Sequence, residues 1–258
     1  MSYADVRRHP ARSVRELATA LAALEARDDD LELAVQLGLS MTAGTRDGRH
    51  GEADVAAGAY DADIDALAAA LNALGRPVYL RIGYEFDGRW NGYEPTTYTE
   101  AFRRVTDRLR ARSVNFATVW CAYPATTDLA YYPGDAYVDW FGIDLFTATE
   151  IGSAEVAAFL DLADAHRKPV MIGESTPRKV GVLDGEESWD VWFAPYFDLI
   201  HRRKEIKAFS YINWNWVNRP PWTTWGDARI EANDVIAAHY REEMRLGLYL
   251  HSAAAAPR

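Results

Sequence analysis

Apolar residues along the chain fall into two alternating patterns, short dense runs and longer stretches with helical spacing. Dense runs rich in β-branched and aromatic residues are typical of buried strands, and apolar residues three or four positions apart are typical of helices. The dense runs predict strands at residues 31–41, 77–85, 115–123, 137–146, 169–174 and 207–216. The helical spacing predicts helices that begin near residues 13, 64, 97, 153, 189 and 231.

Strands and helices that alternate along a whole chain indicate a parallel sheet with helical crossovers. No repeat or internal linker divides the chain, so we expect one α/β domain over residues 1–258 with the (β/α)8 TIM-type barrel fold. Only six strand–helix units are clear, whereas a complete barrel has eight. The two missing units would lie at the N-terminus, where either the barrel is shortened or other segments replace or supply the first two strands.

Two of the predicted strands end in a glutamate, Glu85 after residues 79–84 and Glu174 after residues 169–173. With side chains alternating between faces, Arg81 and Glu85 should share one face of their strand, as should Ile172 and Glu174 of theirs. Catalytic groups of parallel barrels lie at the carboxyl ends of the strands. Glycosidic bond cleavage needs two carboxyl groups at one cleft, one ionised and one with a raised pKa. Glu85 and Glu174 are therefore candidate catalytic residues.

Aromatic residues make up 12% of the chain, and many of the nine tryptophans and fourteen tyrosines stand beside loops. Carbohydrate sites use such rings, because the C–H faces of a sugar pack on a flat aromatic surface. Trp90, Trp120 and Trp214 are candidate platforms for sugar rings. Asn213 precedes Trp214 on a strand expected to be buried, and an amide there needs a partner such as a sugar hydroxyl. Asn91 follows Trp90 in the same loop and is expected to contact substrate as well.

The formal net charge of −10 argues against nucleic acid or an anionic membrane as the main partner. The six histidines lack metal-ligand spacing, and there is neither a phosphate-binding glycine loop nor a Gly-x-Ser-x-Gly turn. We therefore expect no metal and no cofactor. No apolar stretch approaches the length of a membrane span, and residues 1–8 lack the apolar core of a signal peptide. The expected compartment is extracellular if an N-terminal part has been removed, and cytoplasmic otherwise.

Three segments match motifs in a fixed order: Arg81–Trp90, Tyr132–Asp144 and Lys168–Glu174. They resemble glycoside hydrolase family 26, a family of β-mannanases and related retaining enzymes with (β/α)8 barrels. The first family motif is approximately Arg-x-x-His-Glu-x-Asn-Gly-x-Trp. The second is a Tyr-Pro-Gly-Asp segment that leads through Val-Asp into a strand, and the third is a Lys-Pro strand that ends in Glu.

The resemblance implies roles for both glutamates. Glu85 corresponds to the acid/base at the end of barrel strand four, and Glu174 to the nucleophile at the end of strand seven. The strand near residue 31 then becomes the third and the one near 207 the eighth, so that the first two are absent. The implied activity is retaining, endo-type hydrolysis of a mannan-, xylan- or glucan-like β-linked polysaccharide. Such a mechanism predicts two carboxyl groups roughly 5–5.5 Å apart.

The sequence departs from the family pattern at three positions. Tyr84 stands where the family has His, and Asp87 where it has Asn. In related enzymes a tyrosine of strand six hydrogen-bonds the nucleophile, but the nearest position here is Phe146. Either Tyr84 or Tyr123 would then have to supply the hydroxyl, and the sequence leaves both open.

Two further residues of the motifs are candidate parts of the site. Arg81 resembles the strand-four arginine of the family, and it would either orient carboxylates at the substrate or form a buried structural ion pair. Asp144 lies near the end of the sixth barrel strand, and we expect it to accept a hydrogen bond behind the site.

Another class of protein also fits the sequence. A non-catalytic carbohydrate-binding barrel would keep the aromatic platforms and lose the chemistry, and the Phe146 departure and the short N-terminus favour it. A barrel enzyme of another reaction type is a weaker alternative. Oligomeric state is not predicted.

Overall fold

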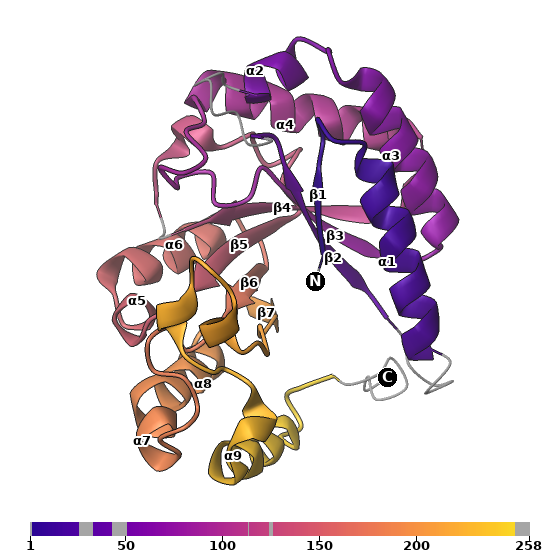
Figure 1. Ribbon diagram of the computed structural model, residues 1–258. Helices are drawn as coiled ribbons and strands as arrows, with labels where there is room; N and C mark the ends of the chain where they lie inside the picture. The colour runs from indigo at the N-terminus through magenta and orange to yellow at the C-terminus, as the bar shows by residue number, and fades with distance from the viewer. Residues whose placement is uncertain (1, 26–32, 43–50, 113, 124–125, 251–258) are drawn as a thin grey trace.

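The computed structural model describes residues 2–25, 33–42, 51–112, 114–123 and 126–250. Within these residues, seven parallel strands form one sheet in the order of the sequence (Figure 1). The strands are β1 (Ser2–Asp5), β2 (Val35–Ser40), β3 (Val78–Ile82), β4 (Phe116–Ala122), β5 (Trp140–Leu145), β6 (Val170–Ser175) and β7 (Ile206–Phe209). This order, with helices between successive strands, is that of a (β/α) barrel.

Helices lie around the outside of the curved sheet (Figure 1). They are α1 (Pro10–Glu25), α2 (Gly51–Ala56), α3 (Asp61–Leu74), α4 (Pro95–Arg110), α5 (Ala148–Ile151), α6 (Ala154–Ala165), α7 (Glu186–Ser188), α8 (Ala194–Arg202) and α9 (Asp234–Met244). A π-helical turn at Trp189–Phe193 joins α7 to α8, and 3₁₀ turns lie at Leu129–Tyr131, Trp216–Asn218, Thr223–Trp225 and Ile230–Ala232.

The helix ends follow from local chemistry. In α3 the apolar residues Ile64, Leu67 and Leu71 are buried, and the helix ends at Gly75 with φ of 66°, a left-handed conformation that glycine adopts without strain. The side chain of Ser153 caps α6 by accepting a hydrogen bond from the backbone N–H of Val156. These signals fix where each crossover ends and the next strand can begin.

The N-terminal strand corrects the predicted strand count. The expectation was that two strands are absent, but β1 pairs in parallel with β2, its residues 2–5 opposite 37–40. The sheet is therefore one strand short of eight, and β1 and β7 are its edges in the described part of the chain. A strand of four residues is too short to show a recognisable period, which explains why the hydrophobic pattern missed it.

Two strands end several residues before their predicted ends. β3 ends at Ile82 and β7 ends at Phe209, although hydrogen bonds from Ser210 N to Ile172 O and from Ile212 N to Ser175 O continue along β6. The predicted strand at 31–41 becomes β2, and residues 31 and 32 lie outside the described residues. The chain after β3 and β7 is consequently irregular, and this irregular chain carries Glu85 and much of the cavity wall.

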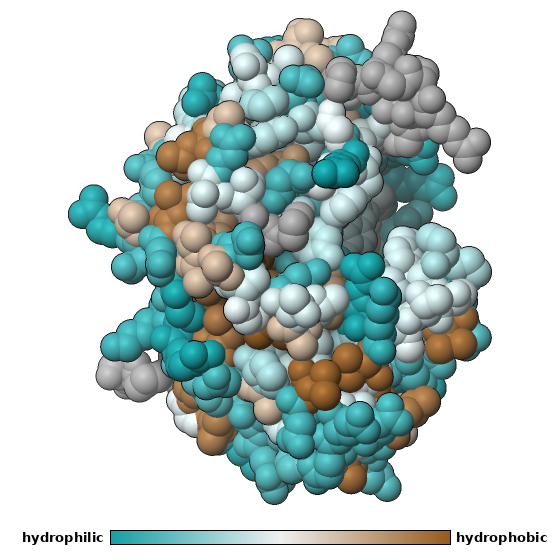
Figure 2. Space-filling view, turned by 90° about the vertical axis from the view of Figure 1, so that its left-hand side faces the viewer, coloured by the Kyte–Doolittle hydropathy of each residue, from teal (hydrophilic) through white to brown (hydrophobic). Residues whose placement is uncertain are grey.

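The surface in Figure 2 is mostly hydrophilic, and hydrophobic residues form small patches between the polar ones. Over the described ranges, no helix combines the length and the apolar character that crossing a bilayer requires.

Candidate active site

Glu85 lies in a tight turn after β3 and not on the strand itself. Gly83 has φ of 56° and Glu85 has φ of 52°, a left-handed value that is rare for residues other than glycine and is often found at functional sites. The side-chain amide of Asn91 holds this turn by donating to the carbonyl oxygens of Tyr84 (3.0 Å) and Glu85 (2.9 Å). The expectation that Glu85 continues the strand alternation is therefore wrong, because the turn redirects its side chain.

The carboxyl group of Glu85 has a pKa near neutral pH. Burial, followed by the negative charge of Glu174, raises its pKa to about 7. The positive charge of Arg81 acts in the opposite direction, as does the hydrogen bond from Trp90 Nε1 to Glu85 Oε2 at 2.7 Å. A carboxyl with this pKa can both donate and accept a proton at neutral pH, as a general acid and base must.

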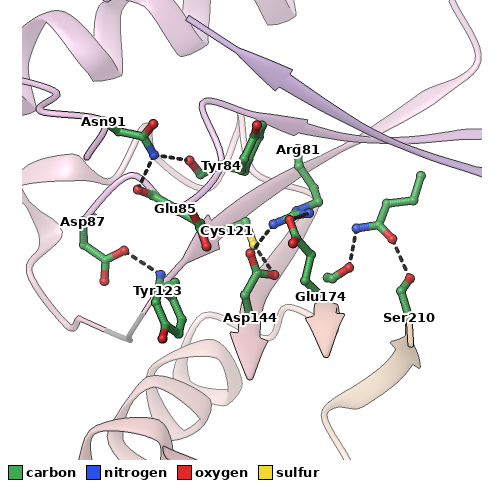
Figure 3. Close-up of polar contacts among 12 residues, drawn as sticks. Arg81, Tyr84, Glu85, Asp87, Asn91, Cys121, Tyr123, Asp144, Glu174 and Ser210 are labelled. Atoms are coloured by element: carbon green, nitrogen blue, oxygen red, sulfur yellow. Dashed lines mark hydrogen bonds and ion pairs between the residues drawn. The ribbon is translucent and has the colours of Figure 1, made fainter. Parts of the chain in front are cut away.

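Glu174 lies near the end of β6 and is only 9% exposed. Arg81 Nη1 donates to Glu174 Oε1 at 2.7 Å, and Arg81 Nη2 donates to Asp144 Oδ2 (Figure 3). Both Arg81 and Asp144 are completely buried. The assignment of Arg81 to substrate contact is therefore wrong, because the guanidinium spans the two carboxylates beneath the site. Asp144 occupies the place behind the site that the sequence predicted.

The Arg81 ion-pair network fits closely against the backbone of β6. A Cβ atom on Gly173 would lie 2.8 Å from Asp144 Oδ1 and 2.9 Å from Arg81 Nε, so glycine is needed there for this approach. On the other side, Cys121 Sγ donates to Asp144 Oδ1 at 3.4 Å, and burial raises the pKa of this thiol well above its usual range. One arginine thus serves two carboxylates, and its full burial fixes the direction of Glu174.

Asp87 and Tyr123 connect the β3 turn to the end of β4. Asp87 Oδ1 accepts a hydrogen bond from Tyr123 N at 2.6 Å, and burial raises the pKa of Asp87 to about 6. The Tyr123 hydroxyl donates to Glu150 Oε1 (2.9 Å) and accepts from Arg178 Nη1 (3.1 Å). The suggestion that Tyr123 supplies a hydroxyl to Glu174 is therefore wrong. Tyr123 instead supports the turn that carries Glu85.

A cavity of about 650 Å³ opens onto Glu85 and Glu174 together. Tyr3 and Tyr84 line it next to the glutamates, and Phe146 lines it as well. The carboxyl separation of ~5–5.5 Å expected of a retaining pair stays a prediction. A cavity that joins two carboxyl groups at the carboxyl ends of barrel strands, one of them with its pKa raised to about 7, is suited to acid–base chemistry on a bound ligand.

Tryptophans of the segment after β7 form much of the cavity wall. Trp214 is 41% exposed and Trp222 is 44% exposed, whereas Trp216 is buried and its Nε1 donates to Thr176 Oγ1 at 3.0 Å. The Arg219 guanidinium lies 4.0 Å from the centre of the Trp214 ring, which is a cation–π contact. The wall therefore combines one buried, hydrogen-bonded tryptophan, Trp216, with the exposed flat rings of Trp214 and Trp222.

The structure contradicts the predicted substrate contact of Trp120 and the reason for the one predicted at Asn213, a buried amide without a protein partner. Trp120 on β4 is fully buried, stacks on Phe86 with ring centres 4.4 Å apart, and donates from Nε1 to Tyr131 O at 3.0 Å. Its ring belongs to the layer between sheet and helices, so it cannot face a ligand. Asn213 is exposed beyond the end of β7, and its amide binds Glu231 Oε2 (2.8 Å) and the backbone of Ile230 (2.7 Å).

The remaining predicted residues lie at or near the cavity. Trp214, Tyr84 and Phe146 line it. Trp90 is 59% exposed and donates a hydrogen bond to Glu85. Asn91 holds the turn by its side chain and is not among the lining residues of the described chain.

Sequence reasoning missed Tyr3, Arg219, Trp222 and Trp225, all of which line the cavity. The sequence carried one usable signal for the tryptophans, the cluster Pro-Pro-Trp-Thr-Thr-Trp after the last strand. In the described part of the chain, no group of three or more His, Cys, Asp or Glu side chains is arranged to hold a metal ion.

Comparison with known proteins gives three findings. The sequence model of glycosyl hydrolase family 26 matches residues 50–192, more than half of the chain. A β-1,3-xylanase from an Alcaligenes species is 32% identical over 222 residues, which cover 74% of this chain and 47% of the relative. The β-1,3-xylanase TXYA from a Vibrio species is 31% identical over 222 residues, which cover 74% of this chain and 48% of the relative. The chain thus spans about half the length of these curated relatives.

Among solved structures, a GH26 β-mannanase from Bacteroides ovatus is similar with a TM-score of 0.69. The similarity covers 93% of this chain and 75% of that chain at 18% sequence identity. At this identity the likeness concerns the fold alone, and it confirms the predicted barrel class.

Proposed function

Because the chain belongs to glycosyl hydrolase family 26, we propose that it hydrolyses a β-linked polysaccharide in an endo-acting, retaining reaction. Because two relatives are β-1,3-xylanases, β-1,3-xylan is the first substrate to test. The observation that carries the proposal is the pair Glu85 and Glu174, which open onto one cavity in different electrostatic surroundings.

In the proposed reaction, the Glu174 carboxylate attacks the anomeric carbon while protonated Glu85 gives its proton to the leaving oxygen. Glu85, now ionised, then takes a proton from water, and the water attacks the anomeric carbon and releases Glu174. The pKa of about 7 suits Glu85 for both steps. The ion pair with Arg81 suits Glu174 for attack, because it fixes the direction of the carboxylate.

The wall of exposed tryptophans supports a polysaccharide substrate. Trp214 and Trp222 present flat rings to the cavity, and such rings pack on the C–H faces of sugars. The cavity is partly open, so a chain longer than the cavity can extend out of it.

The test is a panel of polysaccharides, namely β-1,3-xylan, β-1,4-xylan, mannan, mixed-linkage glucan and β-1,3-glucan, with detection of new reducing ends and sizing of the products. We expect hydrolysis of at least one of them with internal cleavage, and NMR should show that the first-formed product keeps the β-anomeric configuration. Glu174→Gln should abolish hydrolysis while binding to the same polysaccharide persists. Glu242→Gln, on the exposed face of α9, is the matched control and should retain full activity.

Two results would contradict the proposal. An inverted first product would exclude the retaining mechanism. Binding without hydrolysis by the unmutated chain would identify a non-catalytic carbohydrate-binding barrel instead.

A further inference from the structure

The ring of Tyr3 lies across a glycine of the neighbouring strand. Tyr3 on β1 is paired with Gly38 on β2, and Gly38 is in turn paired with Arg81 on β3. A Cβ atom on Gly38 would lie 2.8 Å from Tyr3 Cδ1 and 3.1 Å from Tyr84 Cδ1. The missing side chain of Gly38 therefore makes room for both rings, whose centres are 5.5 Å apart.

From this position Tyr3 reaches Glu174. The two residues line the same cavity, and the Tyr3 hydroxyl hydrogen-bonds the Glu174 carboxylate. Although Tyr3 is 40% exposed, the loss of water around its hydroxyl, followed by the negative charge of Glu174, raises the pKa of Tyr3 far above its usual value, so the phenol keeps its proton and acts as the donor. Glu174 thus has two donors, Tyr3 from the edge strand and Arg81 from below.

The hydroxyl groups of Tyr123 and Ser175 are engaged elsewhere. The Tyr123 hydroxyl donates to Glu150, and Ser175 Oγ contacts Tyr196 and the carbonyl of Ser210. Phe146 lines the cavity without any hydroxyl. The phenol of Tyr3 therefore supplies a contact that none of these three residues makes.

We propose that Tyr3 is a positioning residue that holds the Glu174 carboxylate in place for attack, and that Gly38 is required because its missing side chain lets the Tyr3 ring reach that carboxylate. The role rests on the proposed hydrolytic function. Arg81 alone must satisfy both Glu174 and Asp144, so a second donor restricts the remaining rotation of the Glu174 carboxylate. The titratable and charged groups around it are Tyr3, Arg81, Tyr84, Glu85, Cys121 and Asp144.

The direct test is Tyr3→Phe, which keeps the ring and removes the hydroxyl. We expect kcat to fall about 10- to 100-fold, the size that one hydrogen bond to a charged group predicts, with little change in KM. The acid limb of the pH profile should move to higher pH, because the ionised carboxylate has lost a donor. A purely structural role for Tyr3 would not move that limb.

A second variant and a control separate positioning from folding. Gly38→Ala keeps the hydroxyl but displaces the Tyr3 ring, and it should also lower kcat and move the acid limb upward. Tyr79→Phe, at a ring that packs on Trp140 and is not among the lining residues, should leave both unchanged. Circular dichroism and thermal melting of each variant establish that it is folded.

Two measurements distinguish the failure of this inference from the failure of the proposed function. A crystal structure without substrate should place the Tyr3 hydroxyl about 2.7 Å from a Glu174 oxygen. A longer separation without contact, or a folded Tyr3→Phe enzyme with unchanged kcat and acid limb, would overturn the positioning role while hydrolysis stands. If the unmutated chain hydrolyses no polysaccharide, the proposed function fails and the catalytic role of Tyr3 fails with it.

Discussion

Replacing Trp90 by phenylalanine should extend activity to higher pH. The indole Nε1 donates to Glu85 Oε2 at 2.7 Å, and this hydrogen bond stabilises the ionised form and lowers the pKa of Glu85. Phenylalanine keeps an aromatic ring and removes the donor, so the pKa of Glu85 should rise above its value of about 7. The proposed first step needs Glu85 protonated.

The magnitude follows from the exposure of the donor. A hydrogen bond to a charged group contributes about 1.5–3 kcal/mol, but Trp90 is 59% exposed, so water replaces much of the lost contact. We therefore expect at most about 1.4 kcal/mol, which corresponds to a rise of no more than about one pH unit. The alkaline limb of kcat/KM should shift upward by that amount, so the variant should keep a larger share of its maximal activity above pH ~7 than the unmutated chain.

The assay is kcat/KM on the best substrate of the panel, measured across the neutral and alkaline range. Trp189→Phe is the matched control, because Trp189 stacks on Phe193 in the π-helical turn and is not among the cavity-lining residues. It should leave the profile unchanged. An alkaline limb of the Trp90→Phe enzyme that stays in place or moves to lower pH would refute the reasoning.

Three further substitutions test the stability of the fold and the role of the cavity wall. Arg81→Met should lower the free energy of unfolding by about 3–5 kcal/mol in urea titrations, because it leaves Asp144 buried without its cation. The control Arg202→Met removes only an exposed ion pair and should lower the free energy of unfolding by less than about 1 kcal/mol. Trp222→Ala should raise KM with a smaller effect on kcat in steady-state kinetics, because it removes a ring of the cavity wall; an unchanged KM would exclude this ring from substrate contact. Gly83→Ala should cost about 2–5 kcal/mol in the same titrations, because φ is 56° and the new Cβ would lie 2.7 Å from neighbouring side chains.

The sequence predicted the barrel class and the candidate glutamates because both depend on local patterns. Strand and helix periods come from burial on one face of each element, and that burial can be read along the chain. Glu85 and Glu174 were identifiable because each follows an apolar run, in the place where barrel strands deliver side chains to a site. The family match confirmed the resemblance that these segments suggested.

Local patterns failed where the direction of a side chain depends on a neighbouring strand. Trp120 and Trp214 both lie near the end of a strand, yet Trp120 packs against a helix and Trp214 lines the cavity. For Arg81 the sequence left two roles open, at the substrate or in a buried ion pair, and its position between two carboxylates places it out of reach of the substrate. Nothing in the residue types alone distinguishes these cases.

Residue order along the chain therefore determined the elements of this protein and the chemistry available to it. The tertiary structure decided which side chains meet at Glu174. Tyr3 and Glu174 are 171 positions apart in the sequence and come together only because β1 pairs with β2 and Gly38 leaves space for the ring. Such a contact depends on strand register and on a missing side chain across the sheet, and neither has a periodic signature in the sequence.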